Sequence, residues 1–308
     1  MENKVIEIKN FTKDYGQGRG VFDISFDVFK SECFGFLGPN GAGKSTTIRH
    51  ILAFSKPQSG EILLNGQSTW ENRSKLLGDV GYLPGEIALP NQLTGKEFLN
   101  DISRLKGVKD FTFLNYLKKL FELDDSLLCK EMSLGMKRKL AIVACFMNDP
   151  DILILDEPSS GLDPYMQGVF INFIKKEKER GKTILLSSHI FNEINDTCDR
   201  IAVIKDGKIV SLIKADELRH AKNKRYLVSF KLIADYSSFL NEIKADFKII
   251  HTDKNNYEVL LEAEDEMVNK LISILKKYEP KSLNIYKQSL EEYFMSFYKE
   301  EKTFGGVK

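Results

Sequence analysis

The stretch that decides the fold is Gly38-Pro39-Asn40-Gly41-Ala42-Gly43-Lys44-Ser45, which is followed by Thr46. It fits G-x-x-x-x-G-K-[ST], the pattern of a phosphate-binding loop. The apolar residues 33–37 before it predict a short buried strand, and residues 45–52 after it predict a helix. Glycines let successive backbone N–H groups point at one anion, and a helix N-terminus adds partial positive charge. The stretch therefore predicts an α/β fold in which residues 38–45 bind the phosphates of a nucleotide.

Two side chains of this loop have predicted roles. We expect Lys44 to reach the β- and γ-phosphates, and the hydroxyl of Ser45 to be a ligand of Mg²⁺. The alternative is a chance glycine-rich turn that happens to precede a helix. The combination of strand, lysine, hydroxyl and helix disfavours that alternative, so ATP and Mg²⁺ are the expected cofactors.

Residues 152–157 read Ile-Leu-Ile-Leu-Asp-Glu, an apolar run that ends in two carboxylates. A continuous apolar run is typical of a parallel strand buried on both faces, and ligands bind at the carboxyl ends of such strands. By itself, such a run is usually a strand that meets solvent. Because it follows a phosphate-binding loop, we expect Asp156 to face Mg²⁺ and Glu157 to orient or deprotonate the attacking water.

Composition limits the class of protein. The 308 residues suggest about two domains, and 42% hydrophobic residues are enough for full cores. The formal net charge is only +1, so no nucleic-acid partner is expected from charge. The four cysteines form no C-x-x-C pattern and are expected to be buried thiols in a reducing compartment. The N-terminus has the alternation of a strand, and no apolar run could span a bilayer, so we expect a cytoplasmic location.

The phosphate-binding loop, together with the alternating strands and helices around it, predicts a first domain over residues 1–218 with the sheet of a P-loop NTPase. A helical subdomain is expected at about residues 86–147. Within it, Thr94 and Glu97 have the spacing of a capping box that opens a helix. Ser133 is a good N-cap for a second helix that runs to about residue 147.

A second, smaller domain is predicted after a polar stretch. Residues 214–225 are charged and are expected to form a linker. Residues 225–308 then follow the order β-α-β-β-α-β, with a helix at 264–278 and a last helix at 290–299. This order predicts a ferredoxin-like α+β accessory domain.

Together with four further motifs, these residues resemble the ATP-binding-cassette (ABC) ATPases. Residues 132–136, Met-Ser-Leu-Gly-Met, stand where that family has its signature, typically L-S-G-G-Q. Residues 160–163, Ser-Gly-Leu-Asp, match its D-loop. His189 matches its switch histidine, and Tyr15 lies where the family has an aromatic that stacks on adenine. The resemblance covers about residues 1–215 and includes six motifs in the family's order.

The resemblance implies a role for each of these residues. Lys44, Glu157 and His189 carry catalysis. The signature residues Ser133 and Gly135 face the γ-phosphate held by a second cassette, so that ATP lies between two cassettes. The residues implied in ATP binding are Tyr15, Gly38, Pro39, Asn40, Gly41, Ala42, Gly43, Lys44, Ser45, Thr46, Ser133, Gly135 and Asp163. A lone histidine is more often a packed or surface residue, and Tyr15 alone would indicate packing, but their places in the motif order favour the nucleotide.

Three positions depart from the family pattern. Gly85 stands where the family usually has a glutamine that ligates Mg²⁺, and the next residue is Glu86. We expect Glu86, or Gln92 in a different loop arrangement, to replace that ligand beside Ser45 and Asp156. Leu134 replaces the first signature glycine and Met136 replaces the signature glutamine.

Such departures are similar to one exporter branch of the family, which moves drugs, antibiotic peptides or lipids. That branch often ends in a motif like residues 289–294, Ser-Leu-Glu-Glu-Tyr-Phe. The resemblance implies an ATP-hydrolysing exporter subunit on the inner face of the cell membrane. Its partners would be a separately encoded transmembrane permease and a second cassette, identical or not. The alternatives are a soluble ABC ATPase that acts on ribosomes or DNA, and a regulatory module that does not hydrolyse ATP.

Overall fold

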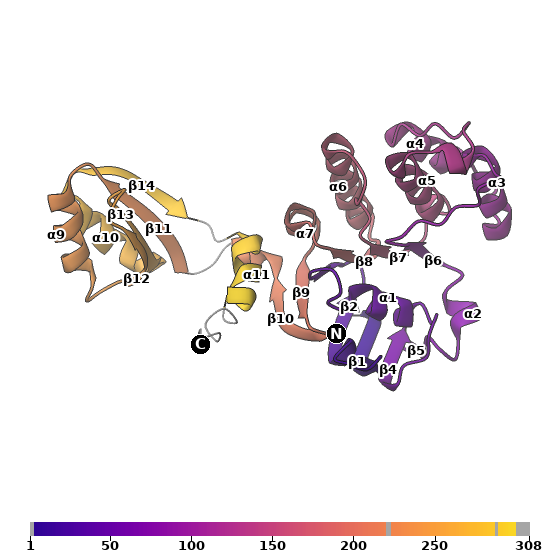
Figure 1. Cartoon of the computed structure of the whole chain (residues 1–308), viewed down its shortest axis with the longest axis horizontal. Coiled ribbons are helices and arrows are strands. Elements are labelled where there is room, and N and C mark those ends of the chain that lie inside the picture. Colours follow the sequence, from indigo (N-terminus) through magenta and orange to yellow (C-terminus); the bar gives the residue numbers. More distant parts are fainter. Residues whose placement is uncertain (1–2, 220–222, 287–288, 300–308) are drawn as a thin grey trace, which may run out of the picture. The chain divides into compact units, whose positions relative to one another are not determined.

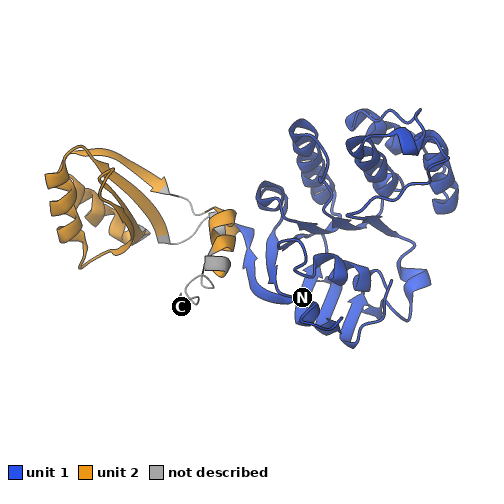
Figure 2. Ribbon diagram, in the orientation of Figure 1, with its two compact units in different colours: residues 1–215 blue, residues 216–308 orange. Residues whose placement is uncertain are grey.

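The computed structural model describes residues 3–219, 223–286 and 289–299. The chain divides into two compact units, residues 1–215 and residues 216–308, which Figure 2 colours blue and orange. All residues predicted to contact the nucleotide belong to the first unit. Each unit is described by itself below.

The first unit is built around a six-stranded sheet in the order β10-β9-β3-β8-β7-β6 (Figure 1). Its inner strands are parallel, and only β10 runs antiparallel, beside β9. Every residue of β3 is buried, as expected for a strand covered on both faces. The strands are β3 (Cys33–Leu37), β6 (Val80–Leu83), β7 (Ile152–Asp156), β8 (Thr183–Ser188), β9 (Arg200–Lys205) and β10 (Lys208–Lys214).

A second sheet, antiparallel and in the order β2-β1-β4-β5, packs against the first sheet and α1 (Lys44–Ile51). Phe26 of this sheet stacks on Phe34 of β3, with ring centroids 5.0 Å apart. Ile48 of α1 is fully buried in the same core. The helix that follows the phosphate-binding loop is therefore held between two sheets. The strands are β1 (Lys4–Asp14), β2 (Gly20–Phe29), β4 (Ser59–Leu64) and β5 (Gln67–Ser68).

Three helices lie together between β6 and β7 in the chain and form the predicted helical region (Figure 1). Thr94 and Glu97 make the expected capping box at the start of α3. Ser133 accepts a hydrogen bond from the N–H of Met136 at 3.2 Å and caps α5, as predicted. The helices of the first unit are α1, α2 (Arg73–Leu76), α3 (Gly95–Lys106), α4 (Thr112–Leu120), the 3₁₀ turn η1 (Cys129–Glu131), α5 (Leu134–Phe146), α6 (Pro164–Glu179) and α7 (Phe191–Thr197).

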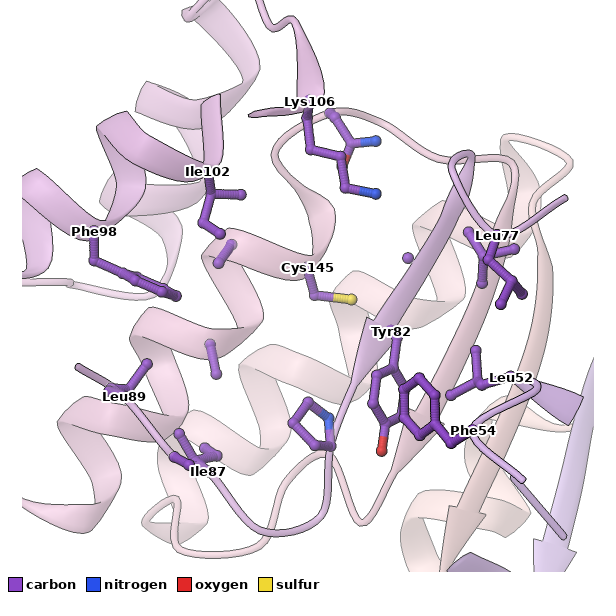
Figure 3. A pocket seen from close by; sticks show the side chains of 17 residues that line it. Leu52, Phe54, Leu77, Tyr82, Ile87, Leu89, Phe98, Ile102, Lys106 and Cys145 are labelled. Atoms are coloured by element: carbon purple, nitrogen blue, oxygen red, sulfur yellow. The ribbon is translucent and has the colours of Figure 1, made fainter. Parts of the chain in front are cut away.

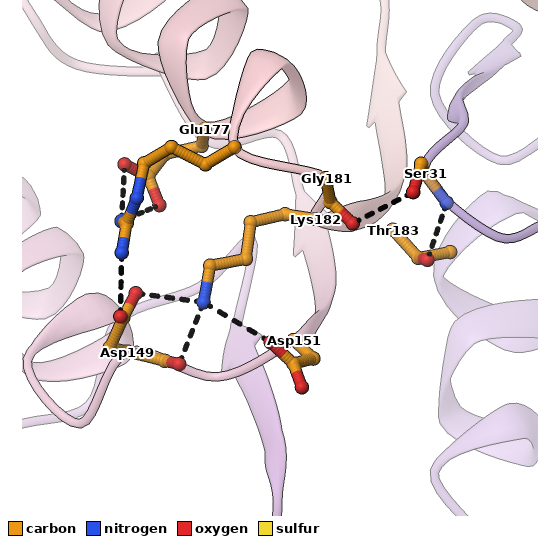
Figure 4. Close-up of polar contacts among 8 residues, drawn as sticks. Ser31, Asp149, Asp151, Glu177, Gly181, Lys182 and Thr183 are labelled. Atoms are coloured by element: carbon orange, nitrogen blue, oxygen red, sulfur yellow. Dashed lines mark hydrogen bonds and ion pairs between the residues drawn. The ribbon is translucent and has the colours of Figure 1, made fainter.

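An ion-pair network fastens α6 to the amino ends of β7 and β8 (Figure 4). Lys182 is buried and lies 2.7 Å from Asp149 and 3.5 Å from Asp151. Arg180 joins the same Asp149 to Glu177 of α6. Because several charges share partners, the network holds the amino ends of these strands more firmly than isolated surface pairs would.

The second unit has an antiparallel sheet in the order β12-β13-β11-β14. Its element order is the predicted β-α-β-β-α-β, and Phe230, Phe239 and Leu261 are central to its core. Its elements are α8 (Ala215–Arg219, which begins in the first unit), β11 (Asn223–Phe230), α9 (Ile233–Ile243), β12 (Lys248–Asp253), β13 (Glu258–Glu264), the 3₁₀ turn η2 (Asp265–Met267), α10 (Val268–Leu275), β14 (Pro280–Tyr286) and α11 (Leu290–Lys299).

Two predictions for this region were wrong. The expected linker over residues 214–225 instead contains α8, and β11 already begins at Asn223. β11 is a central strand, so backbone pairing with β13 and β14 extends it through charged Arg225 regardless of side-chain polarity. The helix expected over 264–278 is shorter, because Glu264 still pairs within the sheet.

Candidate active site

The loop between β3 and α1 has the backbone that the motif predicted. Gly41 and Gly43 have φ values of 84° and 112°, which glycine adopts readily. A Cβ at Gly43 would lie 2.5 Å from Cγ1 of Val21, so a larger residue there would have to displace the side chain of Val21 on β2. The amide of Thr47 donates to the carbonyl of Gly43 at 3.0 Å and continues the loop into the helix. The N–H groups of the loop and the N-terminus of α1 therefore lie side by side, an arrangement that suits the binding of an anion.

Lys44 is buried, with 4% of its surface exposed, and its ammonium is fully occupied. Nζ donates to the carbonyl oxygens of Gly38 at 2.5 Å and Pro39 at 3.3 Å. It also lies 3.0 Å from Oε1 of Glu157. A phosphate entering the loop would compete with these oxygens for the same cation.

The two predicted carboxylates lie at the carboxyl end of β7, as their position in the apolar run required. Asp156 is buried and accepts a hydrogen bond from the hydroxyl of Ser187 on β8. Glu157 has a left-handed backbone with φ 48°, which costs a side chain about 1–2 kcal/mol. Its N–H donates to the carbonyl of Ser187 at 2.9 Å, so pairing with β8 maintains the strained conformation. Strain of this kind is concentrated at functional sites.

The carboxylate of Glu157 lies between a lysine and a histidine. Oε1 faces Lys44, and Oε2 accepts a hydrogen bond from Nδ1 of His189 at 2.6 Å. His189 follows β8 directly and its side chain is about half exposed. The fold therefore unites the three residues predicted to carry catalysis, although they come from three separate segments.

Comparisons with known proteins identify the family to which this chain is similar. The ABC transporter family pattern matches residues 21–160. The ABC transporter ATP-binding protein YhcH of Bacillus subtilis is 31% identical over 97% of both chains. The linearmycin resistance ATP-binding protein LnrL of the same organism is 30% identical over 95% of this chain and 97% of its own. The bacitracin transport ATP-binding protein BcrA of Bacillus licheniformis is 34% identical over 72% of this chain and 74% of its own.

The chain belongs to the ATP-binding proteins of the ABC transporter family. It is an ATPase, and residues 1–215 have the ABC cassette fold. A solved ATP-binding subunit of an ABC transporter superimposes with a TM-score of 0.65 and 30% identity, over 70% of this chain and 92% of that one. In the described residues of the cassette protein, no helix has the length and apolar character needed to cross a membrane.

Residues of two further motifs, the signature and the D-loop, lie at the N-termini of α5 and α6. Asp163 caps α6 by accepting a hydrogen bond from the N–H of Met166 at 3.0 Å. Leu134 is 63% exposed at the start of α5 and lies beside Gly161, whose Cβ, if present, would lie 3.0 Å from Cγ of Leu134. Among the residues that the structure describes, no hydrogen bond or ion pair joins Ser133, Gly135 or Asp163 to the phosphate-binding loop.

Tyr15 is the first residue of the β1–β2 loop and is largely exposed. The ammonium of Lys13 lies 5.3 Å from its ring centroid, so one face of the ring meets a cation. An exposed ring suits the stacking role that the resemblance implied better than it suits core packing. The adenine contact itself stays a prediction.

The residues predicted to hold Mg²⁺ offer hard oxygen ligands, which that ion prefers. Ser45 stands at the start of α1, and Asp156 lies at the end of β7. Gly85, rather than Glu86, faces Asp156: a Cβ at Gly85 would lie 3.3 Å from Oδ2. Glu86 is exposed and makes no hydrogen bond or ion pair within the described ranges.

Glu86→Ala tests whether that carboxylate completes the metal site. We expect a severalfold loss of turnover and a higher Mg²⁺ concentration for half-maximal rate, because one ligand of a hard cation is removed. The measurement is phosphate release against Mg²⁺ concentration. Glu179→Gln, which changes an exposed carboxylate on α6, is the control. Identical curves for Glu86→Ala and wild type would show that the carboxylate is not a ligand.

Two buried charged residues near the site were missed in the sequence. Arg138 stands in a basic run, which usually indicates a solvated surface. Glu193 of α7 is 1% exposed, beside Ser159 and Ser188, and burial raises its pKa to about 7. The available signal was helical spacing: Arg138 lies on the same helix face as the apolar Ala141 and Cys145.

Glu193→Gln should alter how stability depends on pH. A carboxyl whose folded pKa is raised stabilises the fold fully below its unfolded pKa and loses that contribution as pH rises through the folded pKa. From the usual 4.5 to about 7, this amounts to about 3 kcal/mol. The advantage of the glutamine variant in unfolding free energy should therefore grow between pH 4.5 and 8. Denaturant titrations at both pH values measure it, and a constant difference would contradict the prediction.

Proposed function

We propose that this protein is the ATP-hydrolysing subunit of an exporter, bound to a separately encoded transmembrane permease on the inner face of the cell membrane. The observation that carries the proposal is the similarity to the linearmycin resistance ATP-binding protein LnrL, which extends over 95% of this chain. The match therefore includes the second unit as well as the cassette. Other relatives have names that refer to bacitracin transport and Nod factor export.

Within this proposal, residues 1–218 form the nucleotide-binding domain and residues 225–308 an accessory domain. Mg²⁺ would be held by Ser45 and Asp156, with Glu86 as the further candidate ligand, and would supply positive charge to the phosphates. Ser133 and Gly135 bind ATP held by a second cassette. This role is supported by the start of α5, which Ser133 caps and which has no hydrogen bond to the cassette's own phosphate-binding loop in the described part of the chain.

The cassette has a pocket of about 350 Å³, which we propose as the docking site for the permease (Figure 3). Its walls come from β6, the loop after β6, α3, α5 and the segments that follow α1 and α2, and they are mainly apolar. Lys106 lies at its edge. Residues of the walls include Tyr82, Leu89, Phe98, Ile102, Ala141 and Cys145.

The occupant that we propose is a short amphipathic helix of the permease. A pocket of this volume accepts a few apolar side chains from one helix face, which is the usual mode of helix recognition in a groove. Its loop wall includes Pro84, and the adjacent Gly85 lies beside Asp156. A helix seated there would reach the catalytic carboxylates through a single loop.

A single charged substitution on α3 tests whether the pocket is the docking site for the permease. Ile102→Glu places a carboxylate on the apolar wall and should release the protein from membranes that contain its permease. Leu105→Glu is the matched control, because Leu105 is on the same helix, is 81% exposed and does not line the pocket. MgATP binding verifies that both variants are folded. Equal membrane association of the two variants would count against the pocket as the docking site.

Fractionation of cells separates the proposal from its alternative. An exporter subunit should sediment with membranes and co-purify with a membrane-spanning chain. A soluble ABC ATPase that acts on ribosomes or DNA should follow polysomes or nucleoid instead. The net charge of +1 gives no electrostatic support to a nucleic-acid partner.

A further inference from the structure

Arg138 is a buried cation that contacts carbonyl groups rather than a carboxylate. Only 2% of its surface is exposed, and burial lowers the pKa of its guanidinium. No ion pair reaches it within the described ranges of the chain. Removing a charge from water without a paired ion is costly, so its hydrogen bonds have to offset that cost.

Those hydrogen bonds hold two segments that flank the catalytic carboxylates. Nη1 donates to the carbonyl of Pro84 at 2.9 Å and Nη2 to that of Gly85 at 2.6 Å. Nε donates to the carbonyl of Ser160 at 2.8 Å. One planar guanidinium therefore joins the loop after β6 to the segment after β7.

Both segments contact the site directly. Gly85 lies against Asp156, where a Cβ would be 3.3 Å from Oδ2. The amide of Ser160 donates to the carbonyl of Glu157 at 3.2 Å. A shift of either segment would therefore move a carboxylate that acts on the nucleotide.

The same residue also adjoins the pocket. Ala141 and Cys145, one and two turns further along α5, line its wall, as does Pro84. Figure 3 shows Cys145 in this wall. Arg138 thus lies where the pocket wall meets the catalytic carboxylates.

We infer that Arg138 is a positioning residue for ATP hydrolysis: its guanidinium keeps Asp156 and Glu157 in place through the carbonyls of Pro84, Gly85 and Ser160. Arg138 also transmits movement of the pocket wall to these two carboxylates, and this second role rests on the proposed function. In both roles Arg138 acts through these carbonyls and not by contact with the nucleotide. Lysine cannot replace it, because a single ammonium lacks the planar fork that serves two segments at once.

The first test compares Arg138→Lys and Arg138→Met with Arg104→Lys in the full-length protein. Arg104 is an exposed arginine on α3 and serves as the control. We expect both Arg138 variants to lower kcat by about tenfold or more while the Kd for MgATP changes less than about threefold, because small misplacements of reacting groups cost rate more than binding. Methionine removes the desolvation cost, so that variant should fold even if lysine does not.

Two results would overturn the inference. A lysine variant with wild-type kcat would show that positive charge alone suffices. A fall in kcat matched by equal losses in MgATP affinity and thermal stability would reduce Arg138 to a structural brace.

A second arm adds the membrane partner. Arg138→Lys should still sediment with membranes but lose most of the stimulation of turnover that the permease gives to the wild type. Retained stimulation would contradict the transmitting role. If the wild type itself did not associate with membranes, the proposed function would fail, and the kcat comparison of the isolated protein would still decide the positioning role.

Discussion

Glu157→Gln is expected to bind MgATP normally but to lower its turnover by about 10²–10⁴-fold, the usual contribution of a general base. Glutamine keeps the shape of the side chain but cannot accept a proton from the attacking water. The carboxylate that it replaces lies 3.0 Å from Lys44 and 2.6 Å from His189. Removing the negative charge also frees Lys44 from an ion pair, so nucleotide affinity should not fall.

Blocked hydrolysis should also accumulate the dimer that ATP holds together. Phosphate release measures turnover, and size-exclusion chromatography with MgATP measures the mass. Glu179→Gln, an exposed carboxylate on α6, should behave like the wild type in both assays. Wild-type turnover in Glu157→Gln would mean that another group is the base.

Lys44→Ala is expected to weaken MgATP binding by about tenfold to a hundredfold. The change removes a charge-assisted contact worth about 1.5–3 kcal/mol, and each 1.4 kcal/mol is a factor of ten in Kd. It also leaves the carboxylate of Glu157 without its cation partner, which Lys44 provides at 3.0 Å in this structure. Both effects disfavour a bound, negatively charged nucleotide.

Titration with a fluorescent ATP analogue measures this change. Lys176→Ala, an exposed lysine on α6, controls for the loss of a positive charge in general. Equal Kd values for Lys44→Ala and wild type would remove Lys44 from the phosphate site. Thermal unfolding of both variants separates lost affinity from lost fold.

Local patterns in the sequence were sufficient for the phosphate-binding loop, the β7 strand and the starts of α3 and α5. The loop depends on glycines at Gly41 and Gly43 and on a lysine at the start of a helix, all within eight residues. The caps at Thr94 and Ser133 bond to amides three residues away. Such features form between neighbours in the chain, so their spacing alone predicts them.

The tertiary structure alone decided which distant groups meet. Glu157 contacts Lys44 and His189 because β7 is placed one strand away from β3, with β8 between them. The backbone after β6 turns Gly85 toward Asp156, a contact that the sequence did not predict, while the role of Glu86 as a metal ligand stays a prediction.

The burial of Arg138 is also decided by the tertiary structure. A basic run on a helix predicts a solvated surface, because local periodicity contains no information on carbonyl groups elsewhere in the chain. The carbonyls of Pro84, Gly85 and Ser160 become available only when the sheet brings the ends of β6 and β7 together. A buried charge needs hydrogen-bond partners in three dimensions, and for Arg138 those partners come from segments that only the assembled sheet places within reach.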